Sequence, residues 1–261
     1  MKIPLMLFGL AIAMISAPAW AESLVYVAAG SANKIIVIDA ATDKVVGQFD
    51  DIDNPHSIVA TPDGRFVLST HPTRSNISVV DMQQNRVIKT VATGAAPNYA
   101  VVSKDGSRVN VSNSGDNSVS EIDVATWTEV GKFDGGPGPE HMVLSKDGET
   151  LFVLNPRAGT ISAITISQGK ITRTYDIGGT LHGLDISDDG KNLFISNRSE
   201  EKVIMLDPIT DGRKSLSLSP APYHLETING TGKVYVSSKN SPVLWVVDQS
   251  TGELKGEVEI V

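Results

Sequence analysis

The chain contains no cysteine, and this absence removes several kinds of site. Covalent attachment of c-type haem, thiolate-bound metals and a disulfide framework all need cysteine. Positive charge is also scarce, with 22 Lys and Arg against 30 Asp and Glu and a formal net charge of −8. A nucleic-acid binder that works through bulk positive potential is therefore not expected. Any metal site must use nitrogen and oxygen ligands.

Long apolar runs are rare, and the one at the start of the chain predicts export. Ile3–Ile15 is almost wholly apolar, follows the charge of Lys2 and precedes Ala19-Trp20-Ala21. This is the layout of a secretory signal, with cleavage expected before Glu22. The run is short for a membrane span. We expect a signal peptide over 1–21 and a periplasmic protein without a membrane span, the alternative being an uncleaved anchor.

Glycines at a fixed spacing divide the remaining sequence, 22–261, into repeats of one domain. The spacing is 42 residues between Gly64, Gly106, Gly148, Gly190 and Gly232. Four of them follow aspartate, and Asp-Gly between apolar runs predicts a tight hairpin turn with positive φ. Short segments rich in Val, Ile and Thr surround each turn, as in Tyr99–Ser103, Arg108–Ser112, Ser118–Asp123 and Glu129–Phe133. Four-stranded units of this length predict an all-β fold, a β-propeller of four-stranded antiparallel blades.

One segment carries a family resemblance. Arg108–Asp123 reads RVNVSNSGDNSVSEID, and degenerate copies of it begin at Leu24, Phe66, Leu151, Leu193 and Val234. This pattern resembles the YVTN repeat of exported bacterial β-propellers related to YncE. The resemblance covers almost all of 22–261 and implies the propeller fold. It implies little about function, because that family uses one scaffold for many purposes.

The repeats predict six blades, of which one is incomplete. Five complete blades begin near His56, Asn98, Glu140, His182 and His224. Residues 24–52 supply three further strands, so we expect a three-stranded sixth blade. The alternatives are five blades plus a flap, or an open strand edge that is used in a dimer contact.

The residue eight positions before each turn glycine opens the innermost strand of its blade. These residues are His56, Asn98, Glu140, His182 and His224, and they should form a ring at one mouth of the channel. His56, His182 and His224, with Glu140 as a fourth ligand or a base, predict a site for one Cu, Zn or Fe ion. His141 is one residue out of register and is expected to point between blades. The alternative is a structural role, since the resembling family often starts this strand with Pro-His.

Basic residues in the loops between second and third strands should share a face with that ring. Together with Asn98, the predicted binding residues for a small anionic ligand are His71, Arg74, Arg157, Arg198 and Lys239. They contrast with the negative total charge and would draw an anion to this mouth. The alternative is a set of solvated loop charges. His71 stands where Asn113, Asn155 and Asn197 begin the corresponding loops of other repeats.

Catalytic motifs such as Gly-x-Ser-x-Gly and His-Glu-x-x-His do not occur. The sequence is interpreted as a periplasmic propeller that binds a ligand or a partner protein and does not catalyse a reaction. One alternative is a transition-metal or haem-related site in the channel mouth that serves redox chemistry or metal handling. Another is a lactonase-like hydrolase that holds a divalent metal with Glu140 and Asn98.

Overall fold

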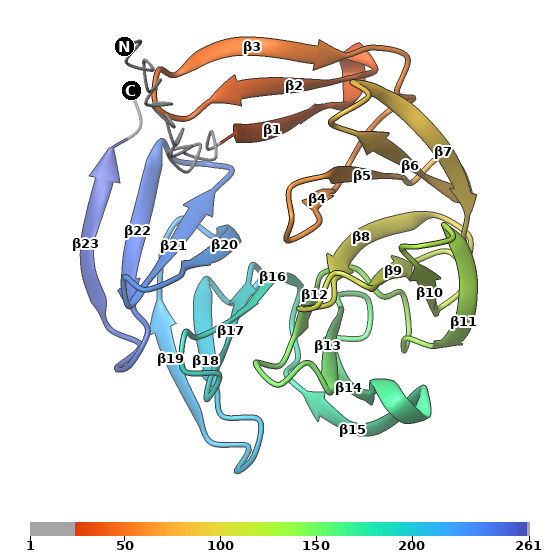
Figure 1. Cartoon of the computed structure of the whole chain (residues 1–261). Coiled ribbons are helices and arrows are strands. Elements are labelled where there is room, and N and C mark those ends of the chain that lie inside the picture. Colours follow the sequence, from red (N-terminus) through yellow and green to blue (C-terminus); the bar gives the residue numbers. More distant parts are fainter. Residues whose placement is uncertain (1–23, 260–261) are drawn as a thin grey trace, which may run out of the picture.

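The computed structural model describes residues 24–259, which form six β-sheets arranged as the blades of a propeller (Figure 1). The prediction of six blades, one of them the three-stranded blade of residues 24–52, is confirmed, and that blade is numbered here as the first. The first blade contains β1 (Leu24–Ala29), β2 (Lys34–Asp39) and β3 (Lys44–Phe49). Two short 3₁₀ turns, Gly30–Ala32 and Ile166–Gln168, interrupt the all-β pattern. The predicted signal peptide lies outside the described residues.

The other five blades have four antiparallel strands each, paired in the order of the chain. The second blade contains β4 (Ile58–Ala60), β5 (Phe66–His71), β6 (Asn76–Asp81) and β7 (Arg86–Ala92). The third contains β8 (Pro97–Val102), β9 (Arg108–Asn113), β10 (Ser118–Asp123) and β11 (Thr128–Asp134). The fourth contains β12 (Met142–Leu144), β13 (Thr150–Asn155), β14 (Thr160–Thr165) and β15 (Lys170–Asp176). The fifth contains β16 (Leu181–Ile186), β17 (Leu193–Asn197), β18 (Lys202–Leu206) and β19 (Arg213–Ser217). The sixth contains β20 (Pro222–Ile228), β21 (Lys233–Ser238), β22 (Val243–Asp248) and β23 (Leu254–Glu259).

The repeated turns have the conformation that the sequence predicts. The five turn glycines have φ between +67° at Gly232 and +79° at Gly148, a region that L side chains rarely adopt. Aspartate closes the turn from the preceding position. In the third blade Asp105 accepts hydrogen bonds from the hydroxyl of Ser103 at 2.6 Å and the amide of Ser107 at 3.0 Å. These bonds favour the charged form and lower the pKa of Asp105 to about 2.

Apolar side chains of the inner strands pack between neighbouring blades. Leu68 and Ile77 of the second blade contact Val109, Val111 and Ile122 of the third in one buried cluster. The fourth strand of each blade is largely exposed, as the pattern of β7 shows. Burial of these inner faces fixes each blade against the next, since the hydrophobic effect scales with the apolar area removed from water.

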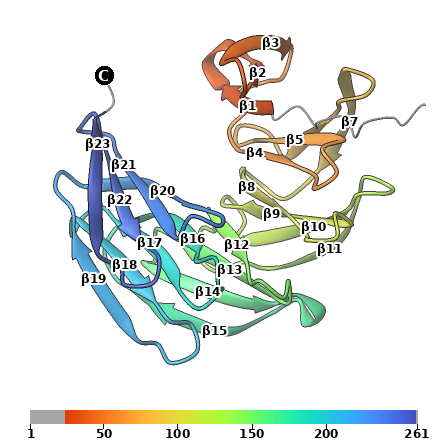
Figure 2. The same cartoon turned by 60° about the vertical axis from the view of Figure 1, so that its left-hand side comes forward.

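The first and last blades meet differently from the other pairs. Figure 2 shows the first blade offset from the sixth. Within residues 24–259, β1 pairs with β2 alone, and its other edge carries no strand. Val25 and Val27 on this strand are 46% and 39% exposed. The first strand position of the first blade is therefore unfilled in this part of the chain.

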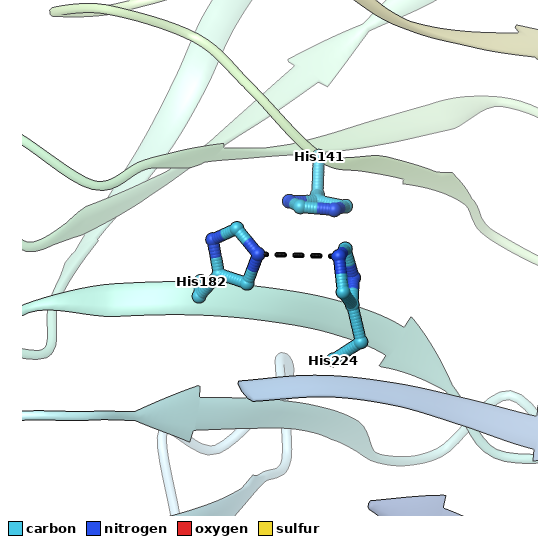
Figure 3. A group of neighbouring side chains, drawn as sticks. All are labelled: His141, His182 and His224. Atoms are coloured by element: carbon cyan, nitrogen blue, oxygen red, sulfur yellow. Dashed lines mark hydrogen bonds between the residues drawn. The ribbon is translucent and has the colours of Figure 1, made fainter. Parts of the chain in front are cut away.

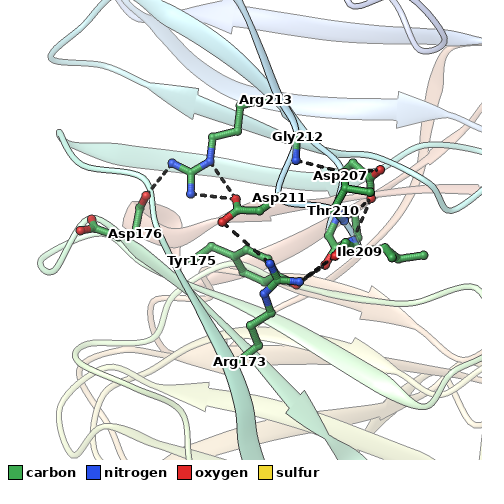
Figure 4. Close-up of polar contacts among 10 residues, drawn as sticks. Arg173, Tyr175, Asp176, Asp207, Ile209, Thr210, Asp211, Gly212 and Arg213 are labelled. Atoms are coloured by element: carbon green, nitrogen blue, oxygen red, sulfur yellow. Dashed lines mark hydrogen bonds and ion pairs between the residues drawn. The ribbon is translucent and has the colours of Figure 1, made fainter.

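A polar network fixes the fourth blade against the fifth at their outer strands (Figure 4). Arg173 on β15 donates to the carbonyls of Pro208 and Ile209 at 2.8 and 3.0 Å. Tyr175 donates to the same Pro208 carbonyl at 2.7 Å. Arg213 of the fifth blade completes the network by donating to a backbone carbonyl at the end of β15. These bonds hold the fourth blade against the fifth. They thereby help to fix the relative positions of the side chains at the inner ends of the two blades.

Among residues 24–259, no helix is long and apolar enough to cross a membrane.

Candidate metal centre

The inner strands begin with irregular pairing, and this decides where their side chains point. In β8, β16 and β20 the register shifts within the first four residues. In the fourth blade two successive residues bond one partner: Glu140 donates to the carbonyl of Leu154 at 2.9 Å, and Leu154 donates to the carbonyl of His141 at 2.8 Å. Such a two-against-one bulge re-aims side chains that strict alternation would place on opposite faces.

Three histidines from three consecutive blades converge at this position (Figure 3). The ligand nitrogens of His141, His182 and His224 all lie within 4.8 Å of one another. Nε2 of His182 and Nε2 of His224 are 3.3 Å apart and share a hydrogen bond. The ring of His141 lies 5.0 and 5.2 Å from the other two ring centroids. The expectation that His141 points between blades is wrong, because the bulge at Glu140 and His141 breaks the alternation on which it depended.

Desolvation favours the neutral form of these imidazoles to different degrees, since His141 is buried, His182 is half-buried and His224 is exposed. His141 is 5% exposed, and its burial, followed by the charges of His182 and His224, lowers its pKa to about 3. Burial also lowers the pKa of His182 to about 3, and the charges of His224, Arg198 and Lys239 act in the same direction. The pKa of His224 is lowered, mainly by burial. Neutral imidazole is the form that binds metal, so each ring has a lone pair available at neutral pH.

One buried nitrogen in the group has no hydrogen-bond partner among residues 24–259. Nδ1 of His141 is buried and makes no hydrogen bond in the described structure. Leaving such an atom unsatisfied costs about 1–3 kcal/mol, so buried polar atoms of this kind need an explanation. A bound ligand is an explanation that agrees with the presence of the two neighbouring imidazoles.

The spacing of the group fits a transition metal. A tetrahedral ion bound at about 2.0–2.1 Å places two imidazole nitrogens roughly 3.3 Å apart. His182 and His224 have this separation, and a small side-chain movement would bring His141 to the same ion. Imidazole ligands suit Zn, Cu and Fe. Three protein ligands leave a coordination position open, unlike the four protein ligands of a closed structural site.

The other residues of the predicted metal set lie close by but outside this group. His56 lies near enough for its charge to lower the pKa of His182 and His224, and its Nδ1 donates to the carbonyl of Asn98 at 3.1 Å. Glu140 is half-buried, and burial raises its pKa against the opposing charges of Arg157 and His56. The structure therefore brings together His182 and His224 of that set, with His141, and does not bring His56 or Glu140 into the group.

Two of the predicted anion-binding residues make internal bonds. His71 is 2% exposed, its Nδ1 donates to the carbonyl of Asp53 at 2.5 Å, and its Nε2 accepts from the hydroxyl of Ser78 at 2.9 Å. In the fourth blade Asn155 donates to the equivalent Ser162 at 2.8 Å, so His71 fills the same bracing role. Arg74 is paired with the carboxylate of Asp53 at 2.6 Å.

Two of the predicted cations lie beside the histidine group, and a third lies near Glu140. Nζ of Lys239 lies 4.0 Å from the ring centroid of Tyr223, and the guanidinium carbon of Arg198 lies 5.2 Å from it. Tyr223 in turn stacks on His182 with centroids 3.8 Å apart and an interplanar angle of 21°. Arg157 lies close enough for its charge to act on Glu140. Asn98, the last predicted binding residue, uses its backbone carbonyl to accept from the hydroxyl of Thr70 at 2.8 Å.

Sequence reasoning missed two residues that shape this channel. Tyr99 lies with its ring centroid 4.8 Å from that of His141, and both line a cavity of about 290 Å³ with His224 and Glu226. Glu226 also borders a second cavity of about 510 Å³. Tyr99 and His141 are 42 residues apart, and each follows a residue of the predicted ring by one position. A comparison of the repeats at that next position would therefore have found Tyr99 together with His141.

Two acids meet where these cavities adjoin. The carboxylate of Asp185 accepts from the amide and the hydroxyl of Thr227, each at 2.7 Å. Glu226 lies near it, and burial, followed by the negative charge of Asp185, raises the pKa of Glu226 to about 7. Asp185 and Thr227 are again 42 residues apart, so they occupy equivalent positions in neighbouring blades. This spacing is the one sequence signal that they lie side by side.

Comparisons with known proteins show the fold and go no further. No family model matches the chain, and no curated protein matches it. Among solved structures, a chain of hydrazine synthase from Kuenenia stuttgartiensis superposes with a TM-score of 0.82. The match has 22% sequence identity and covers 87% of this chain and 74% of that one. At this identity the likeness supports the propeller fold and says nothing of the chemistry at the histidine group.

Proposed function

We propose that this protein binds one transition-metal ion, Zn or Cu, in the mouth of its propeller channel. His141, His182 and His224 would be the protein ligands. The observation that carries the proposal is the convergence of three imidazoles from three blades, whose ligand nitrogens lie within 4.8 Å of one another. The protein's role would then be to handle this metal or to use it at the open coordination position.

The surroundings of the group support this function over a purely structural one. A histidine that only fills the channel rim would be expected to satisfy its ring nitrogens with protein partners, as His71 does. His141 has a buried Nδ1 without one. His182 stands on β16 between Leu181 and Leu184 of the packed core, and His141 directly precedes β12, whose Met142 is buried. Preorganised ligands of this kind favour metal binding.

We also propose that the protein is exported and that it belongs to the YVTN-like propellers. The apolar segment before Ala19-Trp20-Ala21 supports a signal peptide over 1–21 and a periplasmic domain over 22–261. The repeated segments support membership of the YVTN-like propellers. A partner protein on the loop face, and a dimer contact through β1, remain predictions. The lactonase-like alternative is less favoured, because Glu140 stands outside the histidine group.

A metal titration with matched histidine variants tests the function. The purified protein, stripped with a chelator, is titrated with Zn²⁺ and with Cu²⁺ against a competing indicator, and metal content is measured by elemental analysis. We expect one ion per chain and a loss of affinity of at least about 100-fold in His141→Ala and in His182→Ala, since even residues behind the ligands commonly contribute 10–100-fold.

His56→Ala is the control for this titration. His56 lies beside the group but is not a member of it, so its removal should change the affinity by no more than a few-fold. Retained affinity in His141→Ala together with loss in His56→Ala would move the site to the set predicted from the sequence. Failure of the native protein to retain either ion at micromolar concentration would refute metal binding.

A further inference from the structure

Each blade that supplies a histidine to the group also supplies a cation to the rim above it. Arg157, Arg198 and Lys239 follow His141, His182 and His224 by 16, 16 and 15 residues. All three lie on loops between the second and third strands of the fourth, fifth and sixth blades. The histidines and the cations are thus two layers of the same mouth, built by the same part of the ring.

Contacts with Tyr223 join the two layers. One surface of its ring lies against His182, and the same residue holds Lys239 and Arg198 by cation–π contacts. Such contacts fix long side chains that would otherwise extend into water. The charges are close enough to act on the ligands, because those of Arg198 and Lys239 lower the pKa of His182. The cations therefore remain beside the metal site.

Among residues 24–259 these cations form no close ion pair, although Arg157 lies near enough to Glu140 for its charge to act on that carboxylate. Within residues 24–259, none of the three has a carboxylate oxygen within 4.0 Å. On the loop that carries Arg198, Glu200 pairs with Lys202 at 3.2 Å, whereas Glu201 makes no ion pair among the described residues; in the third blade Asp116 pairs with Lys132 at 3.6 Å. Arg198 and Lys239 are therefore available to hold an anion beside His182 in a protein whose net charge is −8.

For a metal ion alone this arrangement is unfavourable, because like charges repel in a partly desolvated site. It becomes favourable when an anion binds between the cations and the ion. We infer, resting on the proposed metal site, that the open coordination position takes a small anion with oxygen donors, a carboxylate or an inorganic oxyanion. Arg198 and Lys239 would hold the far end of this anion, with Arg157 at the edge.

Cobalt spectroscopy tests the inference with both anion types. The protein is loaded with Co²⁺, whose visible spectrum reports its ligands, and titrated separately with oxalate and with inorganic phosphate. We expect a saturable spectral change with at least one of them, and the responding anion identifies the class. In Arg198→Ala/Lys239→Ala the anion should bind at least about 10-fold more weakly, while Co²⁺ binds equally well or more tightly.

Arg74→Ala/Lys202→Ala is the charge-matched control. It removes one loop cation and the first residue of β18, which are paired with Asp53 and Glu200, so anion binding should change less than about two-fold. Equal weakening in both double variants would show a general effect of net charge and overturn the inference. Loss of Co²⁺ in Arg198→Ala/Lys239→Ala would also overturn it.

The result for the native protein separates this inference from the proposed function. Uptake of Co²⁺ without a spectral response to either anion overturns the inference and leaves the metal site in place. No uptake of Co²⁺ by the native protein overturns both.

Discussion

The five complete blades share one repeat. The second and third blades use it for different contacts from those of the fourth, fifth and sixth blades. At the start of the inner strand, the second and third blades carry His56 and Asn98, which bond each other through the Asn98 carbonyl. The later blades carry imidazoles that face a common point. On the loop, Arg74 of the second blade is paired with Asp53, whereas the cations of the later blades are unpaired among the described residues. Position in a repeat does not decide function; the partners of each side chain do.

Two buried histidines show this difference most clearly. His71 and His141 are 2% and 5% exposed, and burial lowers the pKa of both. His71 uses both ring nitrogens in bonds that brace its blade. His141 leaves Nδ1 without a partner in a group of imidazoles. We read the first as a structural residue and the second as a ligand.

The largest expected effect is a reversal between these two residues. His71→Ala should lower the free energy of unfolding by about 2–4 kcal/mol, because it removes two hydrogen bonds and leaves a cavity. His141→Leu should leave the metal-free protein equally stable or slightly more stable, because an unpartnered buried nitrogen is replaced by an apolar group. Urea denaturation in the presence of a chelator measures both.

The distinction between His71 and His141 is refuted if the two variants lose the same free energy of unfolding. Equal losses would mean that His141 is as much a part of the core as His71. Added Zn²⁺ provides the converse measurement, since it should raise the unfolding midpoint of His71→Ala and have no effect on that of His141→Leu.

The sequence was sufficient for the fold because the repeat is carried by local chemistry. Asp-Gly turns, alternating Val and Ile, and the aspartates that end third strands act within one blade. Asp81, for example, accepts from the amides of Gln83 and Gln84 and braces the turn that follows it. Six copies of such local patterns predict a propeller without knowledge of any distant contact.

The site was predicted only in part because it depends on irregular features and on contacts across blades. The 42-residue period indicates that His182 and His224 occupy equivalent positions, and their Nε2 atoms lie 3.3 Å apart. The bulge that brings in His141 comes from pairing with Leu154, which alternation within β12 does not reveal. The ion pair of Arg74 and the stacking of Tyr223 on His182 likewise join segments that are distant in the sequence.

A second effect follows from the pH dependence of stability. An unfolded histidine binds a proton below its ordinary pKa of about 6.5, whereas folded His141 remains neutral down to about pH 3. The metal-free protein should therefore lose stability as pH falls through this window, by at most roughly 1.4 kcal/mol per pH unit for each such histidine. His141→Leu should flatten the curve, so that between pH 6.5 and 4.5 it loses about 2 kcal/mol less than the native chain.

Urea midpoints at pH 4.5, 5.5 and 6.5 test this prediction. His71 titrates equally in both proteins and does not disturb the difference between them. Parallel curves for the native protein and His141→Leu would show that His141 is protonated as readily when folded as when unfolded.

The smallest expected effect compares the two acids deeper in the channel. Glu226 keeps its proton in the folded chain up to about pH 7, above its ordinary pKa, so the native protein loses stability as pH rises through that window. Glu226→Gln removes this loss and should gain up to about 1 kcal/mol between pH 5 and 8, a small effect because the side chain borders channel water. Asp185→Asn should act in the opposite direction at both pH values, because it weakens the charge-assisted bonds from Thr227. Thermal unfolding of both variants at pH 5 and pH 8 measures the contrast. A gain of stability in Asp185→Asn would show that the carboxylate of Asp185 destabilises the fold in the same way as that of Glu226.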